Sequence, residues 1–406
     1  MRTCLIALLV ACPAFAEDWS RFRGPNGTGV SADTSIPTKW SKEDVLFRAE
    51  IPGSGHSSPI VVGKRVFLLS ATDDARLVLC YDATGGKKLW EKSVGGEVGR
   101  THAKSSLASS TPCSDGERLY CAFWDGKRVS LHAYDLEGKA LWTKDLGRFT
   151  SQHGPGFSPV VVAGKVVINL DQDKSAVLLA FDAKTGNQLW KADRPAFRAC
   201  YSTPFVIGEG KDLRLVVAST AGVSAYTLDG ARSWNYAWTF AAAPLRTVGS
   251  PVGADGTIFA CAGDGSGDRS MIAVRPDANG GTPALVWSKE KPKFTPYVPT
   301  LLAKDGHLYG VNDMGVALCF EAKSGEVLWQ KPLSGPVSGS PVLIAGKVYA
   351  TDEKGVCHVF AAETKGLRVL AKNDLGEAVF STPAVADGRL YFRGSTHLIC
   401  VGTKGK

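Results

Sequence analysis

Short apolar runs alternate with turn residues along the whole chain. The run RVFLLS starts at Arg65, KVYAT starts at Lys347 and HLICV starts at His397, and tight-turn pairs such as Asp255-Gly256 lie between runs of this kind. Short runs rich in Val, Ile, Leu and aromatic residues, separated by Gly and Asp, predict β-strands joined by hairpins. The 45 Gly and 21 Pro residues indicate many turns and few long helices. The pattern therefore predicts an all-β protein.

A Ser/Thr-Pro pair opens each repeat of this pattern. The pairs are about 42 to 53 residues apart, a spacing typical of four-stranded propeller blades. Together with a reversed pair, Pro299-Thr300, the anchors are Ser58-Pro59, Thr111-Pro112, Ser158-Pro159, Thr203-Pro204, Ser250-Pro251, Ser340-Pro341 and Thr382-Pro383. The anchors predict eight structural repeats.

Each repeat also carries a recurring phrase, which reads VLLAFDAKTGNQLW at residues 177–190. An aromatic-acidic pair precedes a turn that contains Gly, and in most repeats a Trp follows this Gly by four residues. Because the Trp recurs from blade to blade, we interpret it as a scaffold side chain that docks against the neighbouring blade, and not as a substrate platform. The predicted docking positions are Phe47, Trp90, Trp142, Trp190, Trp234, Trp287, Trp329 and Leu370, with a longer loop before Trp287.

The eighth repeat ends after HLICV and has no fourth strand. Residues 44–48, before the first anchor, align with Glu326–Gln330, and this alignment puts Phe47 at the Trp position. We expect this strand to complete the last blade, because the ring then has no open seam. The prediction is an eight-bladed β-propeller of four-stranded antiparallel blades over residues 44–406, closed by the N-terminal strand.

The beginning of the chain predicts export. One basic residue, a short apolar core and Ala14-Phe15-Ala16 fit a signal peptide over residues 1–16, cleaved after Ala16. The alternative is a lipobox ending at Cys12, which would be lipidated. Residues 17–43 form an N-terminal extension, and no later apolar run is long enough to span a membrane. We expect an exported monomer, either in the periplasm or cell envelope or secreted.

Of the ten Cys residues, Cys4 and Cys12 lie in the predicted leader and eight follow it, with no CxxC and no adjacent pair. Cys80, Cys319 and Cys400 occupy a place where other repeats have Ala. A place that accepts Ala or Cys requires a small buried side chain, and equivalent places in different blades are too far apart to be bridged. We expect free, buried thiols.

Charge and motifs exclude several classes of protein. The formal net charge of +8 is not concentrated in a Lys/Arg block, so we expect no nucleic-acid partner. The chain has no GxSxG, HExxH, P-loop or dinucleotide-binding fingerprint, and we assign no catalytic residue. Asp171-Gln172-Asp173 and residues 264–268 are interpreted as solvated turns and not as cation sites.

The phrase A-x-D-x-x-T-G-x-x-x-W with an upstream S-x-P anchor resembles the PQQ-like repeat, the tryptophan-docking unit of eight-bladed propellers. Residues 19–27 also resemble the leader of secreted bacterial proteins with this repeat. One branch of the family comprises quinoprotein dehydrogenases, which bind pyrroloquinoline quinone (PQQ) and calcium on the propeller axis. The other is similar to the outer-membrane assembly factor BamB, a scaffold without a cofactor. The dehydrogenase branch implies an adjacent Cys pair and long insertions, which this chain lacks.

The resemblance therefore favours a non-catalytic, BamB-like binding or assembly scaffold with no cofactor. The alternative is an enzyme, either a quinoprotein oxidoreductase that uses PQQ with Ca²⁺ or a glycan-active propeller. The sequence favours the scaffold because the repeats are plain and no quinone-site feature is recognisable.

The residues just upstream of each anchor enter the innermost strand and are expected to ring one mouth of the central channel. They include His56, His102, Lys104, His153, Arg198, Tyr201, Arg246 and Tyr297. If they converge, the mouth is a basic, partly aromatic funnel that favours an anionic ligand, either an acidic glycan or a carboxylate-rich loop of an envelope protein. The alternative is a set of separate, solvated loop residues. Because no carboxylate supports the three His residues, we predict no metal site.

Overall fold

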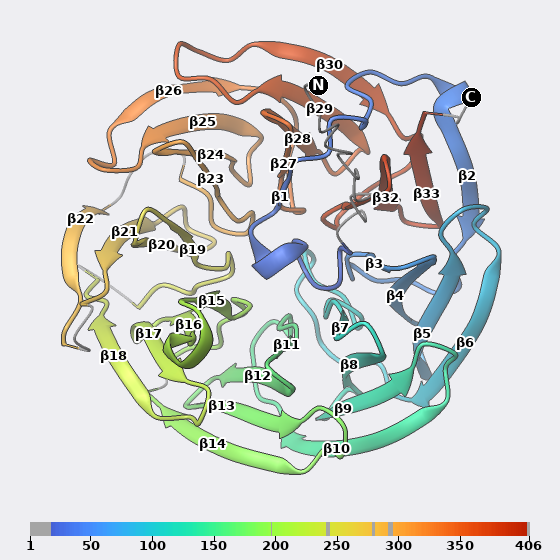
Figure 1. The fold of residues 1–406 in the computed structure, drawn as a ribbon, viewed down its shortest axis with the longest axis horizontal. Helices are drawn as coiled ribbons and strands as arrows, with labels where there is room; N and C mark the ends of the chain where they lie inside the picture. Colours follow the sequence, from blue (N-terminus) through green and yellow to red (C-terminus); the bar gives the residue numbers. More distant parts are fainter. Residues whose placement is uncertain (1–17, 196, 241–243, 278–280, 291–294, 404–406) are drawn as a thin grey trace, which may run out of the picture.

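The computed structural model is a ring of eight β-sheets around a central axis, as Figure 1 shows. It describes residues 18–195, 197–240, 244–277, 281–290 and 295–403, so the predicted signal peptide and Cys12 lie outside the described residues. The helical segments in this part are the short 3-10 turns η1 (Pro25–Gly27), η2 (Lys42–Asp44) and η3 (Gly210–Asp212). None of its helices is long and apolar enough to cross a membrane. The predicted eight-bladed, all-β propeller is confirmed.

The first four blades follow one another in chain order, each from its innermost to its outermost strand. Blade 1 comprises β3 (Ile60–Val62), β4 (Arg65–Ala71), β5 (Ala75–Asp82) and β6 (Lys88–Gly95). Blade 2 comprises β7 (Cys113–Ser114), β8 (Arg118–Trp124), β9 (Arg128–Asp135) and β10 (Ala140–Arg148). Blade 3 comprises β11 (Val160–Val162), β12 (Lys165–Gln172), β13 (Ser175–Asp182) and β14 (Gln188–Arg194). Blade 4 comprises β15 (Phe205–Ile207), β16 (Arg214–Ser219), β17 (Gly222–Thr227) and β18 (Arg232–Ala237).

The next three blades repeat this order. Blade 5 comprises β19 (Val252–Ala254), β20 (Thr257–Gly263), β21 (Arg269–Arg275) and β22 (Ala284–Glu290). Blade 6 comprises β23 (Leu302–Lys304), β24 (His307–Val311), β25 (Val316–Glu321) and β26 (Val327–Pro332). Blade 7 comprises β27 (Val342–Ile344), β28 (Lys347–Thr351), β29 (Val356–Ala361) and β30 (Val369–Asp374).

Blade 8 is built from both ends of the chain. Its inner strands are β31 (Ala384–Ala386), β32 (Arg389–Arg393) and β33 (His397–Gly402), and β2 (Val45–Glu50) pairs antiparallel with β33 as the fourth strand. Phe47 lies opposite Cys400 in this pairing. The N-terminal strand therefore closes the ring, as predicted. Blade 7 differs from the prediction because β1 (Val30–Ser31) adds a fifth strand, parallel to β27.

A ring of hydroxyl groups joins neighbouring blades at their anchors. The backbone N–H of Ser58 donates to Thr111 Oγ1 at 3.0 Å, and the N–H of Thr111 donates to Ser158 Oγ at 3.0 Å. The backbone N–H groups of Thr203, Ser250, Thr300 and Ser340 donate in the same way to the hydroxyl of the following anchor. The N–H of Thr382 donates to Ser58 Oγ. The reversed anchor keeps this role, since Thr300 both donates its N–H and accepts through its hydroxyl. Each Ser or Thr in these bonds satisfies a backbone N–H of the preceding blade.

The outer-strand Trp side chains dock on the next blade. Their indole N–H groups donate to backbone carbonyls of that blade at 2.8 to 3.1 Å, in the pairs Trp90–Leu136, Trp142–Ala183, Trp190–Leu228, Trp287–Ala322 and Trp329–Glu363. Trp234 is buried as well, but the matching turn of blade 5 includes residues 278–280, which lie outside the described part. Each bond anchors a large apolar ring at the seam between two blades.

A Gly lies beneath the docked ring because any side chain there would collide with it. An ideal Cβ on Gly186 would lie 2.5 Å from Trp142 Cδ2, and the φ of Gly186 is +68°. The same close approach occurs at Gly86, Gly138, Gly230 and Gly325, under Phe47, Trp90, Trp190 and Trp287 respectively. The Gly of the repeat is therefore required for two reasons, a left-handed backbone and room for the ring.

The residue that pairs with each Trp across the strands is small. Trp90 lies opposite Cys80 and Trp142 opposite Ala133, with a break in register immediately beside each pair. This is the place that alternates between Ala and Cys in the sequence. All eight Cys of the described residues are free and buried, as predicted. Burial raises the pKa of the Cys80 thiol to about 12, so this thiol stays protonated.

Leu370 is a correction to the predicted docking positions. The pairing register of blade 7 puts Ala371, and not Leu370, opposite Val359, and Leu370 falls in the register break beside that pair. The turn after Phe360 is longer than in most other repeats, so counting from Gly366 misplaced the strand. Leu370 still packs, partly buried, against the cluster of apolar residues shared by blades 7, 8 and 1.

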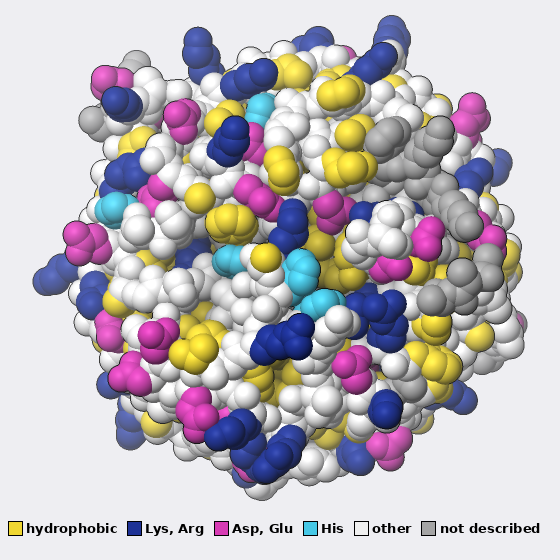
Figure 2. Space-filling view, turned by 180° about the vertical axis from the view of Figure 1, so that it is seen from behind, with side chains coloured by type: hydrophobic (Ala, Val, Ile, Leu, Met, Phe, Trp, Pro, Cys, Tyr) yellow, Lys and Arg dark blue, Asp and Glu magenta, His cyan; other side chains and the backbone are white. Residues whose placement is uncertain are grey.

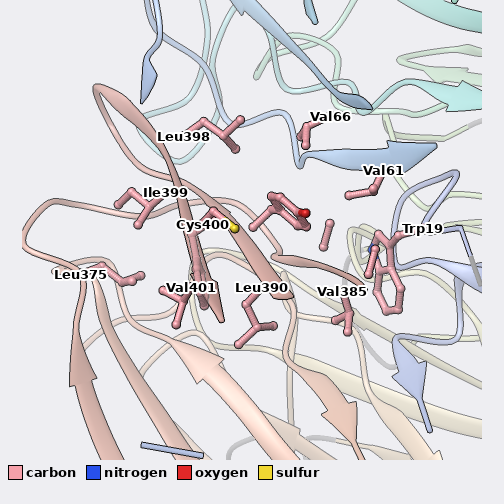
Figure 3. Packing of buried hydrophobic residues seen from close by; sticks show 14 of the residues in the cluster. Trp19, Val61, Val66, Leu375, Val385, Leu390, Leu398, Ile399, Cys400 and Val401 are labelled. Atoms are coloured by element: carbon pink, nitrogen blue, oxygen red, sulfur yellow. The ribbon is translucent and has the colours of Figure 1, made fainter. Parts of the chain in front are cut away.

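The apolar cores lie between neighbouring blades. Figure 3 shows one such cluster, in which Val66 of β4, Leu390 of β32 and Val401 of β33 come from different strands and pack in one group. Trp19 lies in the same cluster and is 2% exposed. The extension before the propeller is therefore part of the packed core, which the sequence did not predict.

The N-terminal extension runs across the end of the ring that faces the viewer in Figure 1. Trp19 forms a β-bridge with Val61 of blade 1, and the carbonyl of Ser20 accepts the N–H of Ser114 in blade 2. Farther along, β1 pairs with blade 7 and Asp33 accepts the N–H of Gly388 in blade 8. The extension thus ties the innermost strands together at one end of the channel.

The hydroxyl ring predicts the effect of removing one acceptor. Thr111→Val keeps the side-chain shape but leaves the buried N–H of Ser58 unpaired, so we expect a loss of about 1–3 kcal/mol in the free energy of unfolding. Thr111→Ser retains the hydroxyl and serves as the control. Equilibrium denaturation of both variants measures the difference, and equal midpoints would contradict the role of the hydroxyl.

The docked ring predicts a second effect. Gly186→Ala introduces a Cβ against Trp142, whereas Gly164→Ala introduces one at a similar φ, +72°, with no atom within 4 Å. The control therefore reports the cost of the left-handed backbone alone, about 1–2 kcal/mol. We expect Gly186→Ala to lower the thermal midpoint further than Gly164→Ala does. Identical midpoints would show that the ring moves aside without cost.

Candidate functional site

Two sets of loops meet at the end of the channel opposite the extension. One set leads from the outer strand of a blade to the inner strand of the next, and the other joins the second and third strands within a blade. Because the strands are antiparallel, both sets lie at the same end. Figure 2 shows His side chains gathered at the centre of this face, with Lys and Arg beside them. We call this end the histidine mouth and define it by His56, His102, Lys104, His153, Arg198, Tyr201, Arg246 and Tyr297.

The three His residues of the mouth do not meet at one point. His102 and His153 are in edge-to-face contact, with ring centroids 4.8 Å apart, and the N–H of His102 donates to the carbonyl of His153 at 3.1 Å. His56 instead stacks on Phe380, with centroids 4.8 Å apart. Its backbone N–H donates to Ala108 O at 3.1 Å, which ties it to the loop that carries His102.

Glu353 joins the mouth although sequence reasoning missed it. Lys104 Nζ lies 2.6 Å from Glu353 Oε1, and Ser338 Oγ donates to the same oxygen at 2.6 Å. This contact links the loop between blades 1 and 2 to the turn between β28 and β29 in blade 7. Only the residues before the anchors were considered in the sequence, and Glu353 lies in the other set of loops. Its place between the second and third strands of a repeat puts it at this end of the channel but does not single it out.

A second group forms around Arg246. Its Nη2 donates to Gln152 Oε1 at 3.1 Å, and the hydroxyl of Tyr201 lies 2.8 Å from Ser151 Oγ. The backbone N–H of Tyr201 donates to Thr247 O at 2.9 Å, so the loops of blades 4 and 5 are joined beside Arg246. Arg198 Nη1 donates to Pro244 O at 2.9 Å in the same two loops.

Tyr297 is held by a neighbouring ion pair. Its backbone N–H donates to Asp313 Oδ2 at 3.1 Å, and Asp313 also lies 3.5 Å from Arg269 Nη2. The guanidinium carbon of Arg269 lies 5.1 Å from the Tyr297 ring centroid, within range of a cation–π contact. Asp313 is a second acidic residue of the β-turns that the sequence analysis did not include.

Two of the imidazoles are neutral at neutral pH. Burial, together with the charge of Arg393, lowers the pKa of His56 to about 4. Burial and the charges of Arg246, His102 and Arg198 lower the pKa of His153 to about 4. Burial raises the pKa of Tyr297 to about 12, so this phenol stays protonated. The fixed positive charges of the mouth are therefore the Lys and Arg side chains.

The location of Asp171 differs from the one expected from the sequence. It was expected in a solvated turn, but it lies in β12, is 1% exposed and accepts from Arg194 Nη1 at 2.6 Å. The pair is buried because strand β12 continues through Gln172. The loop 264–268 is a turn, as expected, since Asp264 Oδ1 accepts the N–H groups of Ser266 and Asp268.

The donors of the mouth do not match a quinone-and-calcium site. A calcium site requires several oxygen ligands around one point, and the described residues contain no group of three or more His, Cys, Asp or Glu that could hold a metal ion. Two carboxylates of the mouth, Glu353 and Asp313, are each paired with a cation. All eight described Cys are buried and unpaired, so none forms a disulfide facing the axis.

Three apolar side chains protrude on the same face. Val98 is 67% exposed, and Phe197 and Met314 are each 57% exposed. Val98 and Phe197 lie in loops between blades, and Met314 lies in the turn between β24 and β25, so all three belong to the loops of the histidine mouth. The other exposed large apolar residues, from 38% to 45%, lie on outer strands at Leu89, Leu141, Leu189, Leu285, Val327, Leu328 and Val369.

Comparisons with known proteins relate the chain to two groups. The family model described as outer membrane protein assembly factor BamB matches residues 33–131, 129–278 and 273–370. BamB of Burkholderia pseudomallei is 24% identical over 340 residues, which cover 82% of this chain and 80% of that protein. The quinohemoprotein alcohol dehydrogenase ADH IIB of Pseudomonas putida is 27% identical over 229 residues, which cover 52% of this chain and only 30% of the dehydrogenase.

Solved structures from both groups share the fold. The europium-containing methanol dehydrogenase superposes with a TM-score of 0.70 at 14% identity, covering 95% of this chain and 89% of that one. BamB of Moraxella catarrhalis superposes with a TM-score of 0.60 at 16% identity, covering 92% and 98%. At this identity the likeness shows the fold alone.

The low pKa of His56 predicts a loss of stability in acid. The unfolded chain takes up a proton near the ordinary imidazole value of 6.5, whereas folded His56 does so only near 4. Stability therefore falls as the pH decreases from about 6.5 to about 4. The unfolding midpoint of the protein should fall over this range, and that of His56→Gln should fall less. Equal pH dependence of the two proteins would contradict a neutral, buried His56.

Proposed function

Because the chain belongs to the PQQ-like-repeat family described as outer membrane protein assembly factor BamB, we propose that it is a non-catalytic scaffold outside the cytoplasm that binds an envelope protein at the histidine mouth. The observation that carries this proposal is the placement of Val98, Phe197 and Met314. They are the most exposed large apolar side chains of the described residues, and all three lie in the loops of one face.

Apolar side chains on loop tips around a polar centre are typical of a protein-binding surface. An exposed Phe or Met gains free energy when a partner covers it, and the polar centre adds selectivity. Charged groups lie in the same set of loops: Lys104, paired with Glu353, follows Val98 in one loop, and Arg198 follows Phe197 in another. The face therefore combines apolar anchors with a charged centre, which suits a protein partner better than a small apolar ligand.

The quinoprotein alternative has less support. The relative of this kind matches over less than a third of its own length, and the mouth lacks a cluster of oxygen ligands for calcium in the described residues. In addition, Lys104 and Glu353 pair with each other, so neither charge is free for a cofactor. We therefore propose a cofactor-free scaffold.

Site-specific crosslinking tests the scaffold. A photo-reactive residue at position 197 or 314, introduced in the native host, should crosslink one envelope protein. The matched controls are position 189, an exposed Leu of an outer strand, and position 64, an exposed Lys in the turn between β3 and β4 at the opposite end of the blades. The variant Val98→Ser/Phe197→Ser/Met314→Ser should reduce recovery of that partner at least tenfold, whereas Leu141→Ser/Leu189→Ser should not.

Two results would contradict the proposal. Crosslinks of equal yield from positions 189 and 64 would show that the partner has no preference for this face. Saturable, micromolar binding of PQQ with Ca²⁺ by the purified protein, followed by absorbance and Trp fluorescence, would favour the enzyme instead.

A further inference from the structure

The seam between blades 7 and 8 lacks the docked ring of the other seams. Ala371 takes the place opposite Val359 where the outer strands of the other blades carry Trp or Phe. The reason lies in blade 8, because its third strand β33 and its fourth strand β2 come from opposite ends of the chain. No turn joins these two strands, so the Gly that lies beneath a docked ring has no counterpart there among the described residues.

Trp40 of the N-terminal extension fills this seam instead. It is 7% exposed, and its ring centroid lies 6.0 Å from that of Phe392 in β32. Ala371 and Phe392 belong to the same apolar cluster as Trp40. The indole Nε1 of Trp40 is buried and has no hydrogen-bond partner in the described part of the chain, whereas five docked Trp rings donate to a carbonyl of the next blade. Trp40 thus supplies apolar contact without the polar bond that fixes the other rings.

The segment that carries Trp40 follows the same seam. Figure 1 shows the chain between β1 and β2 passing between blades 7 and 8. Asn373 of β30 is 1% exposed and holds this segment through both ends of its amide, since Oδ1 accepts the N–H of Trp40 at 3.0 Å and Nδ2 donates to Thr38 O at 3.1 Å. The segment continues through η2 into β2, so Trp40 and the fourth strand of blade 8 belong to one stretch. We call residues 33–50 the clasp.

The seam between blades 8 and 1 also departs from the regular pattern. Phe47 of the clasp docks above Gly86 but has no N–H to donate. The carbonyl of Ala83, which corresponds to the acceptor of Trp142 in blade 3, accepts the hydroxyl of Tyr391 at 3.0 Å instead. A groove of about 590 Å³ lies along this seam, between the end of β2 and the start of β6. Both rings of the clasp, one at each side of blade 8, therefore lack the hydrogen bond of a docked Trp.

Polar contacts that join β2 to elements other than β33 come from the end nearer the histidine mouth. The Tyr81 hydroxyl donates to Glu50 O at 2.8 Å. Arg48 pairs with Glu377 at 3.1 Å and also donates to the carbonyl of Leu375. The Arg48 side chain is 38% exposed, and ion pairs of exposed side chains contribute little to stability. The clasp is thus held mainly by its pairing with β33, by Asn373 and by the apolar contacts of its two rings.

We propose that the clasp is a releasable element: Trp40 leaves its seam and β2 separates from β33, while the rest of the propeller stays folded. The anchor of blade 8 lies outside the clasp, and the bonds of Thr382 with Ser340 and Ser58 do not involve β2. The ring therefore stays closed at its axis when the clasp leaves. Local opening of this kind requires less free energy than global unfolding.

Release has a consequence for the surface of the protein. Without β2, the strand β33 becomes an unpaired edge strand of six residues, the kind of surface at which a strand of another protein can add. The seam covered by Trp40 opens at the same time, because Trp40 and β2 belong to one stretch of chain. This inference goes beyond the proposed function and does not depend on the histidine mouth.

Two thiols at equivalent places supply a test in the wild-type mature protein. Cys400 lies opposite Phe47 of β2, and Cys319 lies opposite Trp329 of β26. Both are fully buried, and burial raises the pKa of Cys400 to about 12 and that of Cys319 to about 11, so neither thiol reacts while its fourth strand is in place. Under native conditions a thiol reagent should label Cys400 at least tenfold faster than Cys319, as measured by mass spectrometry of the labelled peptides.

The variant Trp40→Ala tests the role of the ring. It removes apolar contact from the seam but leaves the backbone groups that Asn373 binds, so labelling of Cys400 should accelerate at least tenfold further while that of Cys319 stays unchanged. Trp40→Phe should give a rate between the two. Trp142→Ala, which removes a docked ring between blades 2 and 3, is the matched control and should leave the labelling of Cys400 as in the wild type.

Hydrogen exchange of the wild-type protein separates release from global unfolding. The amides of β2 and the β33 amides that pair with it should exchange together, and faster than those of β12 and β13 in blade 3. Equal labelling rates of Cys400 and Cys319 in the wild type would overturn the clasp, since blade 8 would then open only with the whole ring. Equal acceleration of both thiols in Trp40→Ala would overturn it for the same reason.

Discussion

The hydrogen bond from one anchor N–H to the next anchor hydroxyl sets how neighbouring blades meet. Seven such bonds run around the ring, and the last returns from Thr382 to Ser58. Each lies where a loop becomes an innermost strand, so the bond places both the strand and the loop before it. By placing the strands and loops, these bonds also limit where the Trp rings at the outer edge and the side chains of the histidine mouth can lie. A fold of this kind depends on closure, because every blade relies on the two beside it.

Recurrence explains what the sequence could predict. Three features recur from blade to blade: the anchors, the Gly-to-Trp spacing, and the Ala or Cys opposite the Trp. A pattern recognised at one blade contact therefore located the equivalent residues at the other contacts. The docking of Trp142 above Gly186 and the closure through Phe47 follow from that spacing. Leu370 was misplaced because its turn is longer, which breaks the count while leaving the strand intact. A register set by pairing is not readable from spacing when the loop length changes.

The extension and the acidic side of the mouth could not be found in this way. Arg23 meets carbonyls of blades 6 and 7, nearly three hundred residues away, and nothing in the local sequence indicates those partners. Glu353 lies in a turn where Asp and Glu are common for local reasons, so its contact with Lys104 left no distinct signal. In both cases the contact joins a unique residue to a distant blade. Repeats reveal what is common to the blades, and a binding site is built from what differs between them.

The cationic side chains at the two ends of the channel have different partners. At the end crossed by the extension, Arg23 is surrounded by carbonyls of its own chain, so no outside group is needed there. At the histidine mouth, Lys104 pairs with Glu353, and among the described residues the guanidinium of Arg246 donates to the amide of Gln152. The same ring serves dehydrogenases and assembly factors, so the fold does not decide between them. That decision rests with the groups around the axis, and a calcium site would require a cluster of oxygen ligands that the described residues do not provide.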